Sequence, residues 1–329
     1  MRPRFLVLGS NCFSGATFAA HVIAQGFDVV GISRSPEPHD CFLPYKQEST
    51  EHFRFVQADV NTDLDRIIAL VEEWRPEFVA NFAAQGMVSQ SWMFPEQWFM
   101  TNTQSMVLLH DRLRRYDFIQ GYLQVSTPEV YGDTQSTVSE ETLYRPSTPY
   151  AASKAACDLS LNTFIKGYGF PAVMTRSTNV CGPAQQLYRI IPKMILSVLL
   201  ERKLSLEGGG EARRSFIHIR DVVDGQFRAI TQGKPGDVFH LATEQVVSIR
   251  ELVECICELL GVRFEDHVEV VASRRGEDGA YLLDCSKAHA ELNWQPRRSL
   301  KDVLHETSDW IKDNIDVLRN LSLDYVHKR

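Results

Sequence analysis

Hydrophobic residues in the first half of the chain fall into short continuous runs, separated by longer segments with apolar residues at helical intervals. The short runs predict buried strands at 4–10, 27–34, 53–60, 76–84, 121–127 and 171–180. The intervening spacing predicts helices at 14–25, 63–74, 97–115 and 150–166. Strands that alternate with helices indicate right-handed βαβ crossovers and a parallel sheet covered on both faces. We therefore predict an α/β fold built on a doubly wound parallel Rossmann sheet.

This alternation changes after Asn179. A Gly- and Arg-rich segment at 208–216 is followed by short strands mixed with helices, and no Pro/Ser-rich linker separates this part. We expect a smaller C-terminal α/β lobe, interwoven with the first, that binds substrate. The predicted NADP-binding Rossmann domain covers 1–178 plus about 217–245, and the predicted substrate lobe covers 179–216 and 246–329.

Composition and charge narrow the function classes. The 329 residues are 44% hydrophobic and 23% charged, which is ordinary for a globular protein. The net charge of −7 argues against general affinity for nucleic acid or an anionic membrane, although local arginines can still bind a polyanionic ligand. No stretch approaches the roughly 18 apolar residues of a membrane span. Seven cysteines without metal-site spacing predict reduced thiols, no bound metal and a cytoplasmic location.

The first predicted strand ends in a turn that is typical of dinucleotide binding. Its sequence, GSNCFSG, begins at Gly9 and ends at Gly15, where the first helix opens. Glycines in such a turn let the backbone approach a pyrophosphate at the positive helix N-terminus. The pattern lacks a middle glycine, for which Cys12 is a small substitute, and a glycine-containing turn without a nucleotide is the alternative. The predicted cofactor residues here are Gly9, Asn11, Cys12, Phe13, Ser14 and Gly15.

The end of the second strand indicates which dinucleotide binds. An acidic residue there would bond the ribose hydroxyls of NAD, but the chain has Ser33, Arg34 and Ser35. Arg34 would pair with a 2′-phosphate, so we expect NADP, with NAD as the alternative. A solvated surface arginine is the simpler interpretation. The remaining predicted cofactor contacts are Asp59 at the adenine edge, Val60, Phe82, Ala83 and Ala84, besides Tyr150 and Lys154.

A catalytic group is predicted from three positions. Tyr150 and Lys154 are four residues apart, so they share one face of a helix. A nearby ammonium lowers the pKa of a phenol, which makes the tyrosine a usable base. Thr127, at the end of the fifth strand, would bond the same substrate oxygen. This grouping suits hydride transfer between a carbinol carbon and nicotinamide.

Taken together, these motifs resemble the extended short-chain dehydrogenase/reductase family, and within it the nucleotide-sugar 4,6-dehydratases. The resemblance covers nearly the whole chain. It rests on STPEVYG at 126–132, RPSTPYAASKAACD at 145–158, TRSTNVCGP at 175–183, GGGEARRSFIHIRDVVDG at 208–225 and RRGEDGAYLLDCSKAHAELNWQP at 274–296.

The resemblance implies an NDP-sugar 4,6-dehydratase that acts on a nucleotide-linked hexose or heptose, with a tightly bound cofactor reduced and reoxidised in one turnover. Tyr150 would take the C4 hydroxyl proton, Lys154 would hold the ribose, and Glu129 would remove the C5 proton. Water leaves from C6 to give a 4-keto-6-deoxy sugar. The expected substrate contacts are Gln85, Val88, Ser91, Asn179, Arg189, Arg214 and Arg274, of which Arg214 and Arg274 would neutralise the diphosphate.

Pro128 departs from the pattern of the resemblance. Dehydratases place an Asp or Ser between the Thr and the Glu, whereas Pro128 can donate no proton. Met87 and Glu277 also stand where many dehydratases have other residues. Three interpretations follow for the proton that the leaving C6 hydroxyl needs. Glu129 serves as both base and acid, another group or a water supplies the proton, or no elimination occurs.

Three alternatives to a dehydratase remain open. An NDP-sugar 4-epimerase does not require Glu129. A UDP-glucuronate decarboxylase would need a cation such as Arg189 or Arg213. A non-catalytic NADP-binding regulatory protein is the distant alternative, since such relatives typically lose the Tyr or the Lys.

The resemblance also implies a homodimer, formed by a four-helix bundle of the helices at 97–115 and 150–166. The apolar residues of these helices would equally suit core-facing stripes. They are Met106, Leu109, Leu113, Ala156, Leu159 and Phe164.

Overall fold

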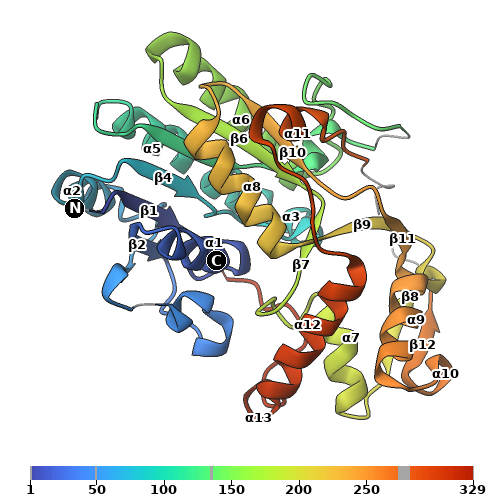
Figure 1. Cartoon of the computed structure of the whole chain (residues 1–329). Coiled ribbons are helices and arrows are strands. Elements are labelled where there is room, and N and C mark those ends of the chain that lie inside the picture. The colour runs from blue at the N-terminus through green and yellow to red at the C-terminus, as the bar shows by residue number, and fades with distance from the viewer. Residues whose placement is uncertain (1, 49, 134–135, 273–281, 329) are drawn as a thin grey trace.

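A seven-stranded parallel sheet forms the centre of the larger lobe (Figure 1). The computed structural model describes residues 2–48, 50–133, 136–272 and 282–328. The strand order is β10-β6-β5-β4-β1-β2-β3, and every pairing in this sheet is parallel. The strands are β1 (Arg4–Leu8), β2 (Asp28–Ser33), β3 (Phe53–Gln57), β4 (Phe78–Asn81), β5 (Gly121–Val125), β6 (Ala172–Ser177) and β10 (Val238–Leu241). The doubly wound α/β fold predicted from the sequence is confirmed.

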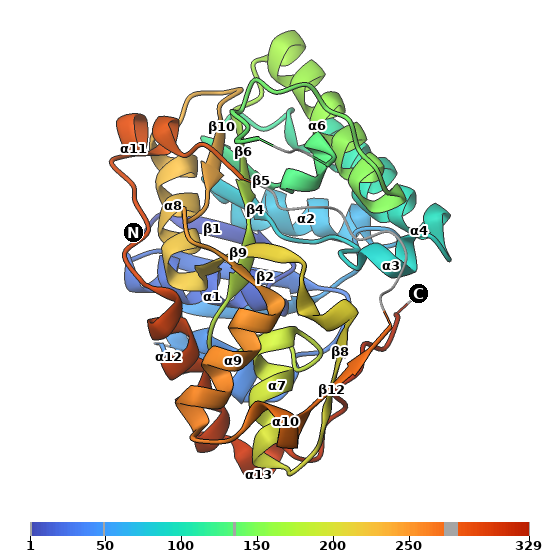
Figure 2. The same cartoon turned by 90° about the vertical axis from the view of Figure 1, so that its right-hand side faces the viewer.

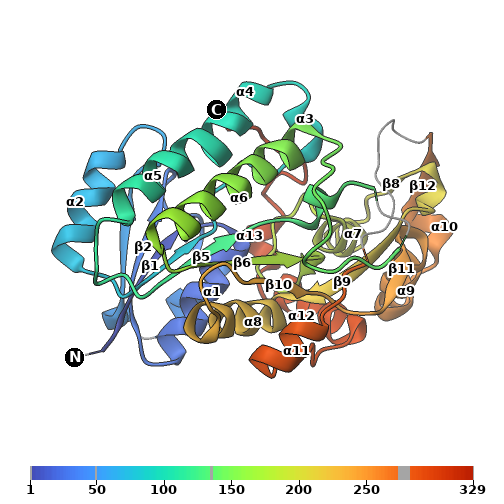
Figure 3. The same cartoon turned by 90° about the horizontal axis from the view of Figure 1, so that it is seen from above.

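Helices cover both faces of this sheet (Figure 3). One face packs against α1 (Phe13–Ala24) and α8 (Ile219–Gln232), and the other against α2 (Leu64–Trp74), α5 (Ser105–Leu113) and α6 (Pro149–Tyr168). Because both faces are covered, the central strand β1 is almost entirely apolar, and four of its five residues are buried. The carboxyl ends of β1, β2, β4 and β5 therefore meet at one edge of the sheet, which is where α/β sheets bind ligands.

The smaller lobe contains two short sheets (Figure 2). One consists of β11 (Val246–Ser248), β9 (Arg213–His218) and β7 (Asn179–Cys181), and the other pairs β12 (Val268–Val271) with β8 (Leu204–Glu207). These strands share an apolar core with α7 (Ile190–Leu199), α9 (Ile249–Leu260) and α12 (Leu300–Asp313). Capping boxes at Ser248 and Ser299 begin α9 and α12.

The remaining elements are short. They are α3 (Val88–Ser91), α4 (Pro95–Phe99), α10 (Phe264–His267), α11 (Ser286–Leu292), α13 (Ile315–Leu318), a π-helical turn η4 (Met100–Gln104), and the 3-10 turns η1 (Asp40–Phe42), η2 (Pro44–Gln47), η3 (Thr50–His52), η5 (Pro128–Tyr131) and η6 (Gly208–Gly210).

Two predicted elements are divided in the structure. The strand predicted at 171–180 ends at Ser177, and β7 begins two residues later in the other lobe, because its partner is β9 rather than β5 or β10. The helix predicted at 97–115 is interrupted by the π-helical turn. There the buried Asn102 side chain bonds the backbone of Gln85 instead of facing solvent.

The residues considered for a dimer interface divide between two environments. Met106, Leu109 and Leu113 belong to the core between α5 and the sheet, so the core-facing interpretation is correct for them. Leu159 on α6 is 57% exposed, and the neighbouring helix adds Leu108 at 51%. All seven cysteines are free. Within the described ranges, no helix has the length and apolar character needed to cross a membrane.

Candidate active site

The turn after β1 brings bare backbone to the N-terminus of α1. Gly9 has a φ of +82°, and a Cβ there would lie 2.7 Å from the Ala83 backbone nitrogen. A Cβ on Gly15 would lie 2.3 Å from the Gly9 carbonyl oxygen. Only glycine fits both places, and the result is a turn with no side chain between the helix N-terminus and a ligand. The turn therefore fits a dinucleotide pyrophosphate.

Cys12 explains how the turn forms without a middle glycine. Cys12 has a φ of −84°, which any residue can adopt. Its Sγ accepts a hydrogen bond from the Gly15 backbone nitrogen at 3.3 Å. Burial raises the pKa of the Cys12 thiol, so it remains neutral. The residue therefore acts as the helix N-cap. Phe13, the next predicted cofactor residue, is buried in the core with Phe82.

The predicted adenosine end of the site lies where β2 ends. Ser33 Oγ accepts from the Asn11 backbone nitrogen at 2.9 Å, and Asn11 Nδ2 donates to the Ser35 carbonyl at 3.0 Å. Arg34 Nη2 donates to the Lys328 carbonyl at 3.0 Å, and Lys328 Nζ donates to Ser35 Oγ at 3.3 Å. A residue about 290 positions away in the sequence thus joins the predicted 2′-phosphate site. Lys328 was not predicted as a site residue, because a single lysine near the chain end belongs to no motif.

The segment that ends in Lys328 is held by aromatic stacking. The His327 ring lies parallel to Phe94 at 5.1 Å and to Trp98 at 5.4 Å, and its Nε2 is 2.8 Å from Gln97 Oε1. The C-terminal end of the chain accordingly lies beside α3 and α4 in two views (Figures 2 and 3). Gln85 Nε2 also donates to the Lys328 carbonyl, at 3.1 Å.

A cavity of about 230 Å³ opens next to these contacts. Three of its lining residues, Arg34, Gln85 and Gln97, bond His327 or Lys328. The complete lining is Arg34, Asn61, Gln85, Glu96, Gln97, Met100 and Thr101.

The other predicted residues of the adenosine end have local roles. Asp59 Oδ1 accepts from the Asn61 backbone nitrogen at 2.8 Å, so this carboxylate caps its own turn. Val60 is part of the core beneath α2. Ala83 is half-buried behind Gly9, and Ala84 is exposed.

The predicted catalytic residues come together at the end of β5. Thr127 caps η5, where its Oγ1 accepts from the Glu129 backbone nitrogen at 3.4 Å. Tyr150 lies in the first turn of α6, which Thr148 caps through a 3.1 Å bond from the Ala151 backbone nitrogen. Lys154 follows one helical turn later, and its buried Nζ donates to the Val125 carbonyl at 2.7 Å.

The ionisation of Tyr150 depends on its burial and on neighbouring groups. Burial, and then the charge of Glu129, raise the pKa of Tyr150 above its usual value. A hydrogen bond with Thr127 and the charge of Arg189 lower that pKa by less. The Lys154 ammonium donates to the Val125 carbonyl, so its influence on the pKa of Tyr150 stays a prediction. The charge of Glu129 therefore acts on the phenol.

Gln85 is held against the catalytic helix. The Asn102 Nδ2 donates to the Gln85 carbonyl and to Ser153 Oγ, both at 3.0 Å, and its Oδ1 accepts from the Gln85 backbone nitrogen at 2.8 Å. Ser153 directly precedes Lys154. Of the other predicted substrate residues in this region, Val88 is half-buried, and Ser91 is fully buried with its Oγ donating to the Val88 carbonyl at 2.6 Å.

The predicted diphosphate residues lie in the smaller lobe. Asn179 Nδ2 donates to the Ser215 carbonyl at 3.1 Å, so it links β7 to β9, which carries Arg214. Arg189 caps α7, and its guanidinium lies 5.4 Å from the Tyr188 ring centre. Arg213 is directed to α9 and lies 3.8 Å from Glu251. Arg274 and Glu277 fall outside the described residues.

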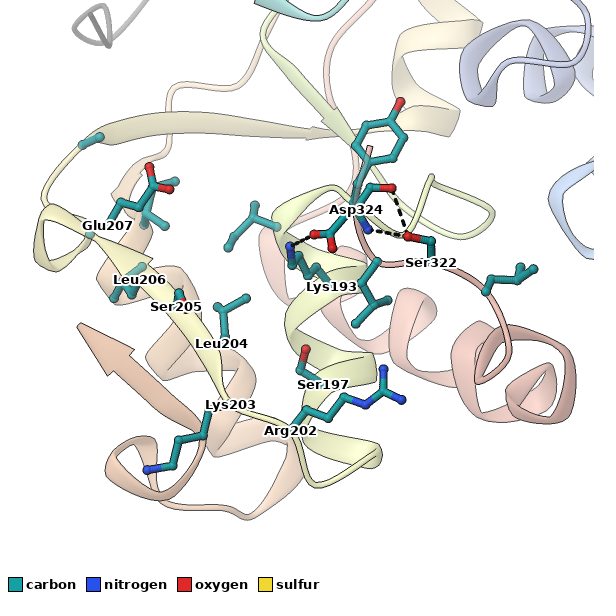
Figure 4. A pocket seen from close by; sticks show the side chains of 17 residues that line it. Lys193, Ser197, Arg202, Lys203, Leu204, Ser205, Leu206, Glu207, Ser322 and Asp324 are labelled. Carbon is teal, nitrogen blue, oxygen red and sulfur yellow. Dashed lines mark hydrogen bonds and ion pairs between the residues drawn. The ribbon is translucent and has the colours of Figure 1, made fainter. Parts of the chain in front are cut away.

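A second, larger cavity of about 800 Å³ lies beyond Arg189 (Figure 4). Lys193 on α7 reaches Asp324 there at 3.0 Å. The cavity has room for a nucleoside, with aliphatic walls and several polar groups. It is lined by Tyr188, Ile190, Lys193, Ser197, 202–207, Gly210, Ala212, Ile249 and 321–324.

Known nucleotide-sugar enzymes are similar to this chain over nearly its whole length. The family model described as GDP-mannose 4,6 dehydratase matches residues 6–307. The dTDP-glucose 4,6-dehydratase of Haemophilus influenzae is 28% identical, over 93% of this chain and 96% of its own. A Streptomyces venezuelae dTDP-glucose 4,6-dehydratase, solved with NAD, has a TM-score of 0.87 and 27% identity, covering 95% and 98% of the two chains. A Bacillus cereus UDP-glucuronic acid 4-epimerase has a TM-score of 0.85 and 26% identity, covering 94% of this chain and 99% of its own. The chain therefore belongs to the GDP-mannose 4,6-dehydratase family of nucleotide-sugar enzymes.

Proposed function

We propose that the protein is an NDP-sugar 4,6-dehydratase, a carbon–oxygen lyase that forms a 4-keto-6-deoxy sugar. The observation that carries this proposal is the position of Glu129 in η5, directly after the Thr127 cap, whose Oγ1 accepts from the Glu129 backbone nitrogen at 3.4 Å; the charge of Glu129 also raises the pKa of Tyr150. A base for the C4 hydroxyl and a second base for C5 are the two groups that such an elimination needs. Simple epimerisation at C4 needs only the first.

Thr127, Tyr150 and Lys154 serve the oxidation at C4. Tyr150 accepts the proton of the C4 hydroxyl while Thr127 bonds the same oxygen. Lys154 holds the nicotinamide ribose. A bound nicotinamide ring would supply a hydride acceptor that takes the C4 hydride and returns it to C6, so no net oxidation occurs.

Glu129 serves the elimination. The new C4 carbonyl acidifies the C5 proton, and Glu129 removes it. Because Pro128 is buried and carries no proton donor, we propose that Glu129 also delivers this proton to the C6 hydroxyl, which leaves as water. When hydride adds to C6, one proton must also return to C5. The proton that Tyr150 took from the C4 hydroxyl accounts for it, so the number of protons is conserved.

For the cofactor, we propose tightly bound NADP, although the solved relative was crystallised with NAD. Ser33, Arg34 and Ser35 present two hydroxyls and a guanidinium where NAD enzymes use an acidic residue. Lys328 Nζ, 3.3 Å from Ser35 Oγ, adds a second cation for a 2′-phosphate.

For the substrate, we propose that the smaller lobe, 179–216 and 246–329, holds the nucleoside diphosphate. Arg214 and Arg274 would neutralise the diphosphate, and Asn179 and Arg189 would be further contacts of the nucleotide sugar. The 800 Å³ cavity between α7, β8 and 321–324 would take the nucleoside.

We propose a cytoplasmic homodimer. The free cysteines fit a reducing compartment. The exposed Leu108 and Leu159 on adjacent helices α5 and α6 are suited to a four-helix interface.

A 4-epimerase is the second candidate, and Pro128 favours it. The missing proton donor does not affect a reaction that only oxidises and reduces C4. Of the two cations considered for a decarboxylase, Arg213 lies 3.8 Å from Glu251, whereas the charge of Arg189 acts on Tyr150.

Incubation with a panel of NDP-hexoses, NDP-heptoses and NDP-uronates, followed by mass spectrometry, tests the proposal. We expect loss of water without added cofactor, abolished in Glu129→Gln and in Tyr150→Phe. An epimerised product of unchanged mass, or release of carbon dioxide, would replace the dehydratase by one of the alternatives. A matched control is Glu73→Gln, which removes an exposed carboxylate of α2 that lies 3.9 Å from Arg54.

A further inference from the structure

A buried polar network lies behind the catalytic segment and has no role in the chemistry above. Its centre is an ion pair between Arg176 on β6 and Asp158 on α6, at 3.0 Å, with both side chains completely buried. Buried ion pairs contribute little net stability. Among the described residues, Arg176 Nε and Asp158 Oδ1 also find no hydrogen-bond partner. Stability alone therefore does not explain the pair.

The pair reaches both ends of the catalytic segment 126–131. At one end, Ser126 Oγ donates to Asp158 Oδ2 at 2.5 Å. At the other end, Arg176 Nη1 donates to the Tyr131 hydroxyl, and the guanidinium carbon lies 4.8 Å from the centre of that ring. Thr127 and Glu129 lie between these two anchors.

The direction of every hydrogen bond at the Tyr131 anchor follows from the donors available. The Asp284 carbonyl can only accept, so His240 Nδ1, 3.1 Å away, carries a proton. Burial, the main cause, lowers the pKa of His240 to about 3, so the imidazole is neutral and its Nε2 is an acceptor. Tyr131 therefore donates to His240 Nε2 at 2.7 Å and accepts from Arg176. The Tyr131 hydroxyl thus donates one hydrogen bond and accepts another.

The two anchors serve different chemical groups. The Ser126 end is also tied to α6 through the bond from Lys154 to the Val125 carbonyl. Thr127, Tyr150 and Lys154 are thereby held as one unit. The Tyr131 end is two residues from Glu129 and is tied instead to β6 and β10.

We propose that Tyr131, through Arg176 and His240, is a positioning residue that aims Glu129 at the C5 proton, while Ser126 and Asp158 hold the residues that oxidise C4. This inference rests on the proposed dehydratase function for its kinetic consequence. Its structural part, the anchoring of η5, is independent of that function.

Tyr131→Phe tests the inference with Tyr144→Phe as its matched control. Both phenols bond Arg176, and the guanidinium carbon lies 4.8 and 4.9 Å from their ring centres. Only Tyr131 belongs to the catalytic segment. Both variants keep the aromatic ring and leave the ion pair intact, so both are expected to fold.

Two measurements are made on each variant. The first is backbone hydrogen exchange in peptides covering 126–132, where Gly132 donates to the Glu129 carbonyl at 3.1 Å. We expect exchange about tenfold faster in Tyr131→Phe and unchanged in Tyr144→Phe. The second is single-turnover absorbance of the reduced nicotinamide with the nucleotide sugar. We expect it to accumulate in Tyr131→Phe, with water loss slowed roughly 10- to 100-fold and C4 oxidation within about twofold.

The outcomes separate the two proposals. Unchanged exchange in Tyr131→Phe, or equal slowing of C4 oxidation and water loss, would overturn the positioning role. Equal effects of Tyr131→Phe and Tyr144→Phe would also overturn it. If the wild-type protein releases no water from any nucleotide sugar but the exchange difference is found, the dehydratase proposal fails and the anchoring of η5 is supported.

Discussion

The two ends of the cofactor cleft are built in different ways. At the predicted catalytic end, Thr127 caps η5, Tyr150 and Lys154 lie on α6, and a fully buried ion pair joins α6 to β6. At the adenosine end, Arg34 and Ser35 are half-buried and bond Lys328 from the far end of the chain. The first end depends on the packing of the central sheet, and the second on one docked segment. The proposed catalytic residues are therefore held by the core, whereas the proposed contacts to the adenosine lie at the surface.

The strongest test of this comparison removes one partner of the buried pair. Asp158→Asn leaves the Arg176 guanidinium buried without its counter-charge, so the free energy of unfolding is expected to fall by about 3–5 kcal/mol. Chemical denaturation measures it. Asp65→Asn is the control, because the Asp65–Arg112 pair is formed at 2.9 Å but Asp65 is 91% exposed. That change is expected to cost less than about 1 kcal/mol. Equal costs would mean that the catalytic end is not held by this pair.

The second test concerns the glycine turn between β1 and α1, where the dinucleotide pyrophosphate is proposed to bind. Gly9→Ala forces a Cβ to 2.7 Å from the Ala83 nitrogen, in addition to a positive φ that costs roughly 1–2 kcal/mol. We expect the purified variant to lose its bound dinucleotide, measured by absorbance of the denatured supernatant. Gly26→Ala has a similar φ of +91° but nothing within 4 Å, so it should lose stability and keep the cofactor. Retention by both variants would contradict the assigned pyrophosphate site.

The third test sharpens the assignment of the adenosine end. Lys328→Met removes the ammonium beside Ser35, and the affinity for NADPH is expected to fall about tenfold, or about 1.4 kcal/mol. The affinity for NADH should stay within about twofold. Nucleotide fluorescence titration measures both. Lys46→Met is the control, because that neighbouring lysine pairs with Glu37 at 3.1 Å. An equal loss of affinity for NADPH and NADH would show that Lys328 does not recognise the 2′-phosphate.

The smallest effect concerns pH at the catalytic end. Glu129 raises the pKa of Tyr150 because its negative charge disfavours phenolate, and Thr127 lowers it by a hydrogen bond. C4 oxidation requires phenolate and therefore increases with pH through this pKa. Glu129→Gln should shift that increase to lower pH, and Thr127→Val should shift it to higher pH. Stopped-flow reduction of the bound cofactor follows both profiles. Shifts in the same direction would contradict the arrangement of the three side chains.

Much of the fold could be predicted because its strands are short and continuously apolar. The alternation of such runs with helical spacing predicted six of the seven strands of the large sheet by approximate position. The exceptions have local physical causes. The segment 171–180 changes sheets after Ser177, and the π-helical turn at 100–104 follows from the buried Asn102 amide. Neither cause has a signal in the hydrophobic pattern.

The sequence by itself determined the local chemistry: the glycine turn, the spacing of Tyr150 and Lys154, and the Thr127-Pro128-Glu129 order. These signals lie within one turn or one strand end, where neighbours in the chain are neighbours in space. Only the tertiary structure decided that Lys154 bonds Val125, that Arg176 and Asp158 reach both ends of 126–131, and that Lys328 meets Arg34. Such contacts join residues 18 to 294 positions apart. They depend on which side chains the packed core and the docked segment bring together, and no local pattern encodes that.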